Sequence, residues 1–127
     1  MSQLRCLAVI LVTLLACQCG SSSSPAGPVI TITNFQYSPA DLAVKPGTTV
    51  TVVNHDADAH SVTSQSTANA FTPGAVAGIH FDTGSFHTTA TFSLPATALP
   101  GTVIPYFCTV HGTMAGMGTG RITIVPP

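Results

Sequence analysis

Short runs of β-branched and aromatic residues alternate with Gly and Pro turns along most of this chain. The sequence has 11 Gly and 10 Pro in 127 residues, and residues 45–47 and 99–101 have the Pro-Gly pairs of tight turns. No segment carries the 3.6-residue apolar period of an amphipathic helix. The pattern predicts an all-β fold, a two-sheet antiparallel Greek-key sandwich of about seven to eight strands. The expected strands cover residues 29–35, 42–44, 48–53, 61–63, 88–94, 102–108 and 121–125.

The N-terminal residues differ from the rest and are expected to lie outside the fold. Residues 1–16 carry Arg5 followed by an apolar run, which is typical of an export signal and too short for a permanent membrane span. Residues 17–28 are rich in Ser, Pro and Gly, as flexible linkers are. A chain of this length supports one domain, which is expected at residues 29–127.

Cys17 is a candidate lipidation site. The run Leu14 to Cys17 resembles the bacterial lipobox, in which the Cys becomes the lipidated first residue of the mature protein. Because Gln18 rather than Asp follows it, this resemblance implies an anchor in the outer membrane or the outer leaflet. The alternative is ordinary cleavage near Ala16 or Gly20, which would leave a free periplasmic protein. In both cases we expect an exported protein on the periplasmic or cell-surface side.

Charged residues are scarce in the sequence. There are three Lys and Arg against four Asp and Glu, so the chain lacks the basic patch that nucleic-acid binding needs. Nucleic acid is therefore not an expected partner. Docking to a protein partner would rely on apolar contact rather than on electrostatic steering.

Three residue types, found mostly near the C-terminal end, suggest a metal site. Cys108 and His111 are separated by two residues, Met114 and Met117 follow closely, and His60 comes after an upstream strand. A thiolate with two imidazoles and a weak thioether is the ligand set of a type 1 copper site. If Cys108 ends a strand, His111 in the next loop can turn toward the same ion.

The sequence from residue 29 to 125 resembles the cupredoxins, the family of plastocyanin, amicyanin and azurin. The matching segments are residues 53–56, 60–62, 81–84, 101–112 and 120–124, in this order. The resemblance implies one type 1 copper ion with His60, Cys108 and His111 as equatorial ligands. It also implies that Ser61 ties the two ligand loops together near the thiolate, and Asn54 is expected to brace the same loop.

The axial ligand is where the sequence departs from the family pattern. The gap between His111 and Met114 matches amicyanin, but the axial Met usually stands two residues before the Gly that opens the last strand. Counting back from Gly120, Met117 misses that position by one residue and Met114 by four. Strand register favours Met117, and Met114 stays the alternative.

Other candidate groups have simpler interpretations. Export favours disulfides, so a bridge between Cys19 and Cys108 is the alternative interpretation of these two cysteines. Two points oppose it, because Cys19 lies in the linker and Cys108 comes three residues before His111. Asp56 and Asp58 are interpreted as solvated turn residues. The side chains of His55, His80 and His87 are also expected to be exposed to solvent.

These features predict a non-enzymatic mononuclear copper protein. It would carry single electrons between periplasmic or membrane redox partners, and a redox protein would dock near His111. The principal alternative is a copper chaperone or storage lipoprotein. Catalysis at several copper centres is disfavoured because no second His cluster is present, and a copper-free adhesion module would require an oxidised Cys108.

Overall fold

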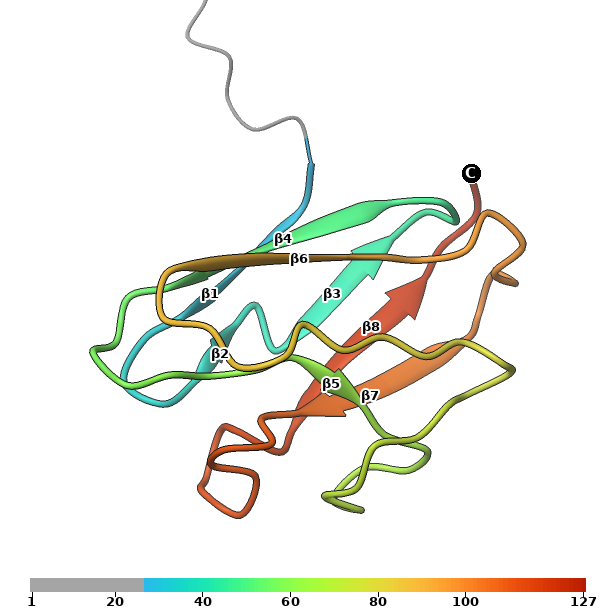
Figure 1. Cartoon of the computed structure of the whole chain (residues 1–127). Coiled ribbons are helices and arrows are strands. Elements are labelled where there is room, and N and C mark those ends of the chain that lie inside the picture. The colour runs from blue at the N-terminus through green and yellow to red at the C-terminus, as the bar shows by residue number, and fades with distance from the viewer. Residues whose placement is uncertain (1–26) are drawn as a thin grey trace, which may run out of the picture.

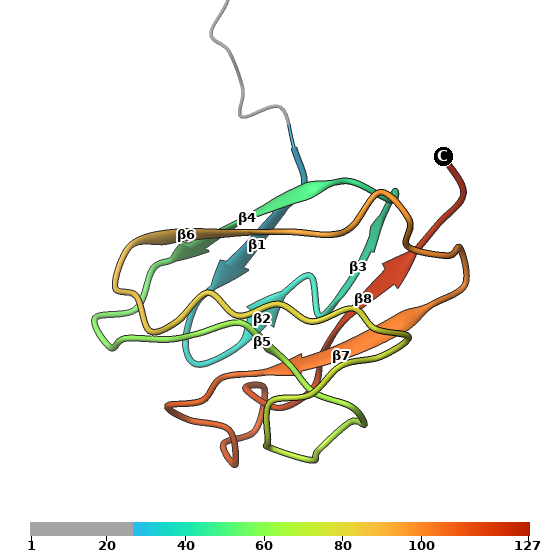
Figure 2. The ribbon, with the colours of Figure 1, turned by 45° about the vertical axis from the view of Figure 1, so that its right-hand side comes forward.

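The computed structural model of the chain describes residues 27–127, which form two four-stranded sheets packed face to face (Figures 1 and 2). One sheet has the order β2-β1-β4-β6, with β1 (Val29–Ile32), β2 (Tyr37–Ser38), β4 (Thr49–Asn54) and β6 (Thr89–Ser93). The other has the order β3-β8-β7-β5, with β3 (Asp41–Val44), β5 (Thr63–Ser64), β7 (Val103–Phe107) and β8 (Gly120–Ile124). The all-β sandwich predicted from the sequence is confirmed.

In one respect the sheets differ from the prediction, because each is mixed rather than purely antiparallel. β1 pairs with β4 in parallel, and β3 pairs with β8 in parallel. Between β1 and β4 the chain crosses to the other sheet and forms β3 there. It then returns to the first sheet, where β4 lies beside β1 and runs in the same direction. Strand spacing in a sequence does not reveal such a crossover.

The first strand is also shorter than predicted. β1 ends at Ile32, and the chain reverses at once into β2 through a two-residue turn closed by mutual backbone hydrogen bonds between Thr33 and Gln36. The two turn residues, Asn34 and Phe35, have φ of 53° and 58°, which is the type I′ geometry that suits hairpins. Phe35 looks like a strand residue in the sequence, whereas tertiary contacts hold it in the turn.

Alternating apolar residues from the two sheets fill the core. Ile30, Ile32, Val50 and Val52 point inward from one sheet, and the inward residues of the other are Ile104, Tyr106, Ile122 and Ile124. All are fully or almost fully buried, as expected for strands with a two-residue period. The packed core gives the loops at the ends of the sandwich a rigid base.

β4 and β7 both lead toward the same end of the sandwich. The loop after β4 and the loop between β7 and β8 meet at the left-hand end in Figure 1. Residues 65–88 connect β5 to β6 through a long irregular segment with isolated bridges, as predicted for most of that region. Loops that lie side by side at one end of a sandwich commonly carry the binding residues.

The predicted export signal at residues 1–16, the lipidation site Cys17 and most of the linker at residues 17–28 lie outside the described residues. Within residues 27–127, no helix is long and apolar enough to cross a membrane.

Gly120, the first residue of β8, offers a test of the packing. A Cβ atom at this position would overlap the ring of Tyr106 on the neighbouring strand, which is itself fully buried. We expect Gly120→Ala to lower the free energy of unfolding by about 1–3 kcal/mol, since overpacking forces side chains off their rotamers. Urea denaturation of the domain measures this. The adjacent exposed Thr119→Ala serves as control, and equal stability of the two variants would contradict the packing described.

Candidate metal centre

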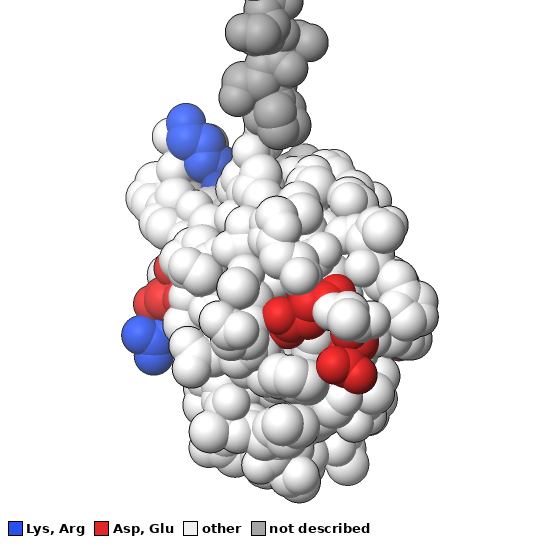
Figure 3. Space-filling view, turned by 90° about the vertical axis from the view of Figure 1, so that its left-hand side faces the viewer, with Lys and Arg blue, Asp and Glu red and all other residues white. Residues whose placement is uncertain are grey.

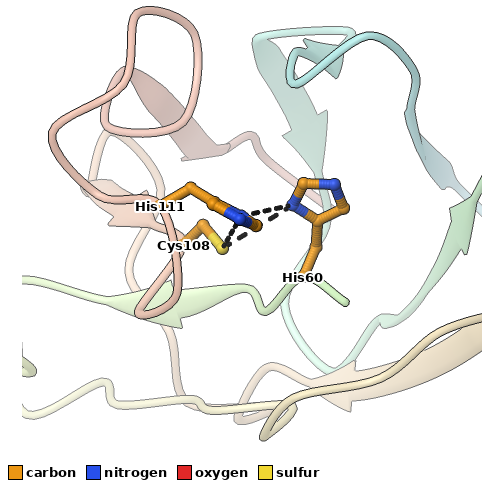
Figure 4. A group of neighbouring side chains, drawn as sticks. All are labelled: His60, Cys108 and His111. Carbon is orange, nitrogen blue, oxygen red and sulfur yellow. Dashed lines mark hydrogen bonds between the residues drawn. The ribbon is translucent and has the colours of Figure 1, made fainter. Parts of the chain in front are cut away.

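Two histidines and one cysteine converge at this end of the sandwich. His60 Nδ1 lies 3.3 Å from His111 Nδ1, and Cys108 Sγ lies 3.8 Å from each of these nitrogens. Figure 4 shows the three side chains pointing toward one another from separate segments of the chain. His60 and Cys108 are fully buried, whereas His111 is half-buried. They form the one cluster of potential His, Cys or carboxylate metal ligands found within residues 27–127.

The spacing of the three donor atoms fits one metal ion. A point in their plane lies about 2.1 Å from each atom, and imidazole nitrogen and thiolate sulfur bind metal ions such as zinc at about 2.0–2.3 Å. One thiolate and two imidazoles in a trigonal plane, with a weak axial ligand, are typical of type 1 copper sites. The donor set therefore suits copper, and the spacing of the donor atoms suits binding of a single metal ion.

Backbone pairing and an Asn side chain shape the loop that carries His60. His60 and Phe86 exchange two backbone hydrogen bonds of 3.0 and 2.8 Å. Asn54, at the end of β4, donates through Nδ2 to the carbonyl of Asp58 at 2.8 Å and accepts the N–H of Asp56 at 2.9 Å. The Asn54 side chain, predicted to brace this loop, thus spans it through these two hydrogen bonds.

Ser61 connects the two loops that carry the ligands. Its backbone N–H points at Cys108 Sγ at 3.4 Å, and its Oγ accepts the N–H of Thr109 at 2.9 Å. Tyr37 donates its hydroxyl to the Ser61 carbonyl at 2.6 Å inside the core. Burial, reinforced by the nearby Cys108, raises the pKa of Tyr37 far above its ordinary value, so the phenol remains a neutral donor. Ser61 is thereby held on three sides.

The interpretation of Asp56 as a solvated turn residue is wrong. Its carboxylate accepts the N–H groups of Asn34 at 2.7 Å and Phe35 at 2.9 Å, and its Oδ2 lies 3.0 Å from His60 Nε2. Burial alone would raise the pKa of Asp56, but these hydrogen bonds outweigh it and hold the pKa below its usual range. The four-residue spacing from His60 was the signal available in the sequence, although it does not distinguish Asp56 from a surface residue.

The two candidate axial methionines lie in different environments. Met117 is fully buried in the core cluster that also contains Cys108, and its carbonyl accepts the Cys108 N–H at 2.8 Å. Met114 is 45% exposed. Gly116, with φ of 91°, precedes Met117 in the loop. Burial beside the thiolate favours Met117 over Met114 as the axial residue.

The other histidines of the sequence are not part of this cluster. His55, His80 and His87 are exposed. Cys108 is a free, buried thiol, and Cys19 lies outside the described residues. Figure 3, which faces the end of the sandwich that carries the site, shows a mostly uncharged surface with a few acidic side chains near its middle.

The sequence of this chain also matches the model of a known protein family. The model of the copper-binding proteins of the plastocyanin/azurin family matches residues 28–125. No match was found among curated proteins.

Several solved structures share the fold of this chain. An oxidized methionine-to-leucine mutant of amicyanin superposes with a TM-score of 0.58 at 19% identity, covering 81% of this chain and 86% of that one. An oxidized proline-to-glycine mutant of amicyanin has a TM-score of 0.54 at 23% identity, with 82% and 87% covered. A reduced Cu(I) form, at pH 4, of another proline-to-glycine mutant has a TM-score of 0.56 at 19% identity, with 81% and 86% covered.

Removal of the Ser61 hydroxyl tests the connection between the loops. Ser61→Ala leaves the Thr109 N–H without its acceptor in a partly buried place, which we expect to cost about 1–3 kcal/mol of unfolding free energy. Urea denaturation of the metal-free domain gives the value. Ser85→Ala, at an exposed loop position, is the control. A Ser61→Ala protein as stable as this control would show that the hydroxyl does not join the loops.

Proposed function

Because the chain belongs to the plastocyanin/azurin family of copper-binding proteins, we propose that it carries single electrons between redox partners at one type 1 copper site. His60, Cys108 and His111 are the proposed equatorial ligands, and Met117 is the proposed axial ligand. The observation that carries this proposal is the triangle of two Nδ1 atoms and one Sγ atom, whose sides measure 3.3, 3.8 and 3.8 Å.

Copper in such a site supplies a one-electron Cu(II)/Cu(I) couple. The protein holds the donor atoms in fixed positions, because Ser61 ties Cys108 to the loop of His60 and because both of these ligand residues are fully buried. A rigid ligand set changes little between oxidation states. Small rearrangement favours electron transfer over chemistry on a substrate.

The same rigidity argues against the alternative of a copper chaperone or store. A chaperone must release its ion to an acceptor, which requires ligands that an incoming protein can reach. Here the thiolate and one imidazole are buried, and His111 is the one equatorial candidate that reaches the surface. Release would require the ligand loops to open.

The electron is proposed to leave through the half-buried His111. Exposed apolar side chains stand beside it in the same loop, with Val110 49% and Met114 45% exposed. An uncharged apolar surface suits brief contact with a redox protein that also docks through apolar groups. Partner docking near His111 is therefore part of the proposal.

We also propose that the protein is exported and tethered to a membrane through Cys17. The position at which the linker joins the domain supports this proposal. β1 runs parallel to β4, so its first residue Val29 lies toward the start of β4 and its last residue Ile32 pairs with Asn54 beside the site. The linker at residues 17–28 thus joins the domain at the end away from the ligands. An outer-membrane anchor through that linker would leave the His111 surface free for a periplasmic partner.

Optical and electron paramagnetic resonance spectra of the copper-loaded domain test the proposal. We expect an intense blue thiolate-to-Cu(II) band and a narrow parallel hyperfine splitting, both lost in Cys108→Ser. Colourless protein with ordinary tetragonal copper signals would contradict a type 1 site. If the blue protein hands its ion to an apo-acceptor faster than it exchanges electrons, the chaperone function is correct instead.

Substitution at Met114 tests the docking surface separately from copper binding. Met114→Glu places a charge beside His111, and we expect electron self-exchange to slow about tenfold, because the two approaching copies then repel each other. The blue spectrum should persist, since Met117 is the proposed axial ligand. Leu99→Glu, at a 70% exposed apolar position before β7 and far from its ligand-bearing end, is the matched control. Equal rates in the two variants would place docking elsewhere. A shifted blue band with an altered hyperfine splitting in Met114→Glu would make Met114 the axial ligand.

A further inference from the structure

Asp56 contacts two different parts of the metal centre with one carboxylate. Oδ1 accepts the N–H of Asn34, while Oδ2 accepts the N–H of Phe35 and lies 3.0 Å from His60 Nε2. Its side chain is 11% exposed. If Nδ1 of His60 faces the metal, Nε2 carries the proton of the ring and donates to the carboxylate. This contact fixes both the tautomer and the ring plane of His60.

The turn that Asp56 holds is unfavourable by itself. Asn34 adopts the left-handed region readily, but an aromatic residue such as Phe35 at φ of 58° is an outlier. Residues in such conformations persist where their surroundings determine them, and they are common at functional sites. Here the Asp56 carboxylate accepts hydrogen bonds from the consecutive N–H groups of Asn34 and Phe35, and these bonds stabilise the conformation of the turn.

The turn brings the Phe35 ring against both imidazoles. Its centroid lies 5.3 Å from that of His60 and 5.0 Å from that of His111, with the planes at 80° and 86°. The backbone of the same turn also touches the loop of Cys108, because a Cβ at Gly116 would meet the Phe35 carbonyl oxygen at 2.7 Å. Phe35 therefore covers the two rings from one side, and its position depends on Asp56.

The charge of Asp56 is not neutralised by a nearby cation. The basic residues in the described part of the chain are Lys45 and Arg121, and Arg121 pairs with Asp41 at 2.8 Å on the opposite sheet. An anion hydrogen-bonded to a ligand imidazole makes that ligand more basic. It also favours the more positively charged, oxidised state of a site beside it.

We propose that Asp56 is a positioning residue that locks His60 and the Phe35 cover in place and lowers the reduction potential of the copper site. The proposal rests on the proposed copper ligation by His60 and goes beyond it, because it assigns the control of the potential to a residue that is not a ligand. The carboxylate acts through its hydrogen bond to His60, and its two backbone hydrogen bonds keep Phe35 over the rings.

Redox titration of copper-loaded Asp56→Asn tests the proposal. At a fixed applied potential we expect the ratio of reduced to oxidised protein to rise about tenfold over the wild type, which corresponds to about 59 mV for one electron. Asp58→Asn is the matched control. It removes the same charge from the same loop, but the described hydrogen bonds of Asp58 involve its carbonyl and not its carboxylate. We expect a much smaller shift in this control.

Two outcomes would overturn the proposal while leaving the type 1 site intact. Equal potentials for Asp56→Asn and Asp58→Asn, in two blue proteins, would show that the contact to His60 does not matter. A Phe35→Leu variant with the full shift of Asp56→Asn would show that the carboxylate acts through the ring cover alone. In contrast, a wild-type protein without a blue band would contradict the proposed function itself.

A measurement on the wild-type protein decides the question if Asp56→Asn does not fold. In the diamagnetic Cu(I) form, NMR should detect the Nε2 proton of His60 as a slowly exchanging, downfield signal, because it is buried and hydrogen-bonded. The corresponding proton of half-buried His111 should exchange faster. Equally fast exchange at both rings would overturn the proposal.

Discussion

The hydrogen bonds of Ser61 hold together the two loops on which the rest of the site depends. Cys108 and Thr109 lie 47 and 48 positions away from Ser61 in the chain, yet both are tied to it, the first through the thiol and the second through a backbone N–H. Tyr37 fixes the same residue from the core. Two of these bonds are buried and the one to Thr109 is partly buried. Breaking them would leave polar groups without partners, and this cost holds the ligand loops at a fixed distance from each other.

Around this connection, the site is built as a chain of dependent contacts. Asn54 sets the loop that presents Asp56, Asp56 orients His60, and the same carboxylate keeps the Phe35 turn in an otherwise unfavourable conformation. Each contact involves a short polar side chain, which meets a backbone N–H in two cases and the imidazole of His60 in the third. Such contacts fix direction as well as distance, which a centre with a compromise geometry for two oxidation states requires.

The fold separates the buried part of the site from the part that reaches the surface. Cys108 and His60 lie in the core, where water does not reach the thiolate, while His111 emerges among exposed apolar residues. Few charges surround this surface (Figure 3). Recognition there would depend on shape and apolar contact, and the acidic group closest to the metal centre is turned inward to serve His60 rather than a partner.

The sequence by itself determined the sandwich and the identity of the three donor residues. Strand length, β-branched composition and turn residues are local properties, and the spacing of Cys108 and His111 is a local constraint on one loop. The parallel pairing of β1 with β4, the turn at Phe35, the burial of Met117 rather than Met114 and the role of Asp56 were decided by the tertiary structure. Most of these features depend on contacts between segments far apart in the chain, which a pattern along one segment does not encode. The local signals were the strand register that favoured Met117 and the four-residue spacing between Asp56 and His60.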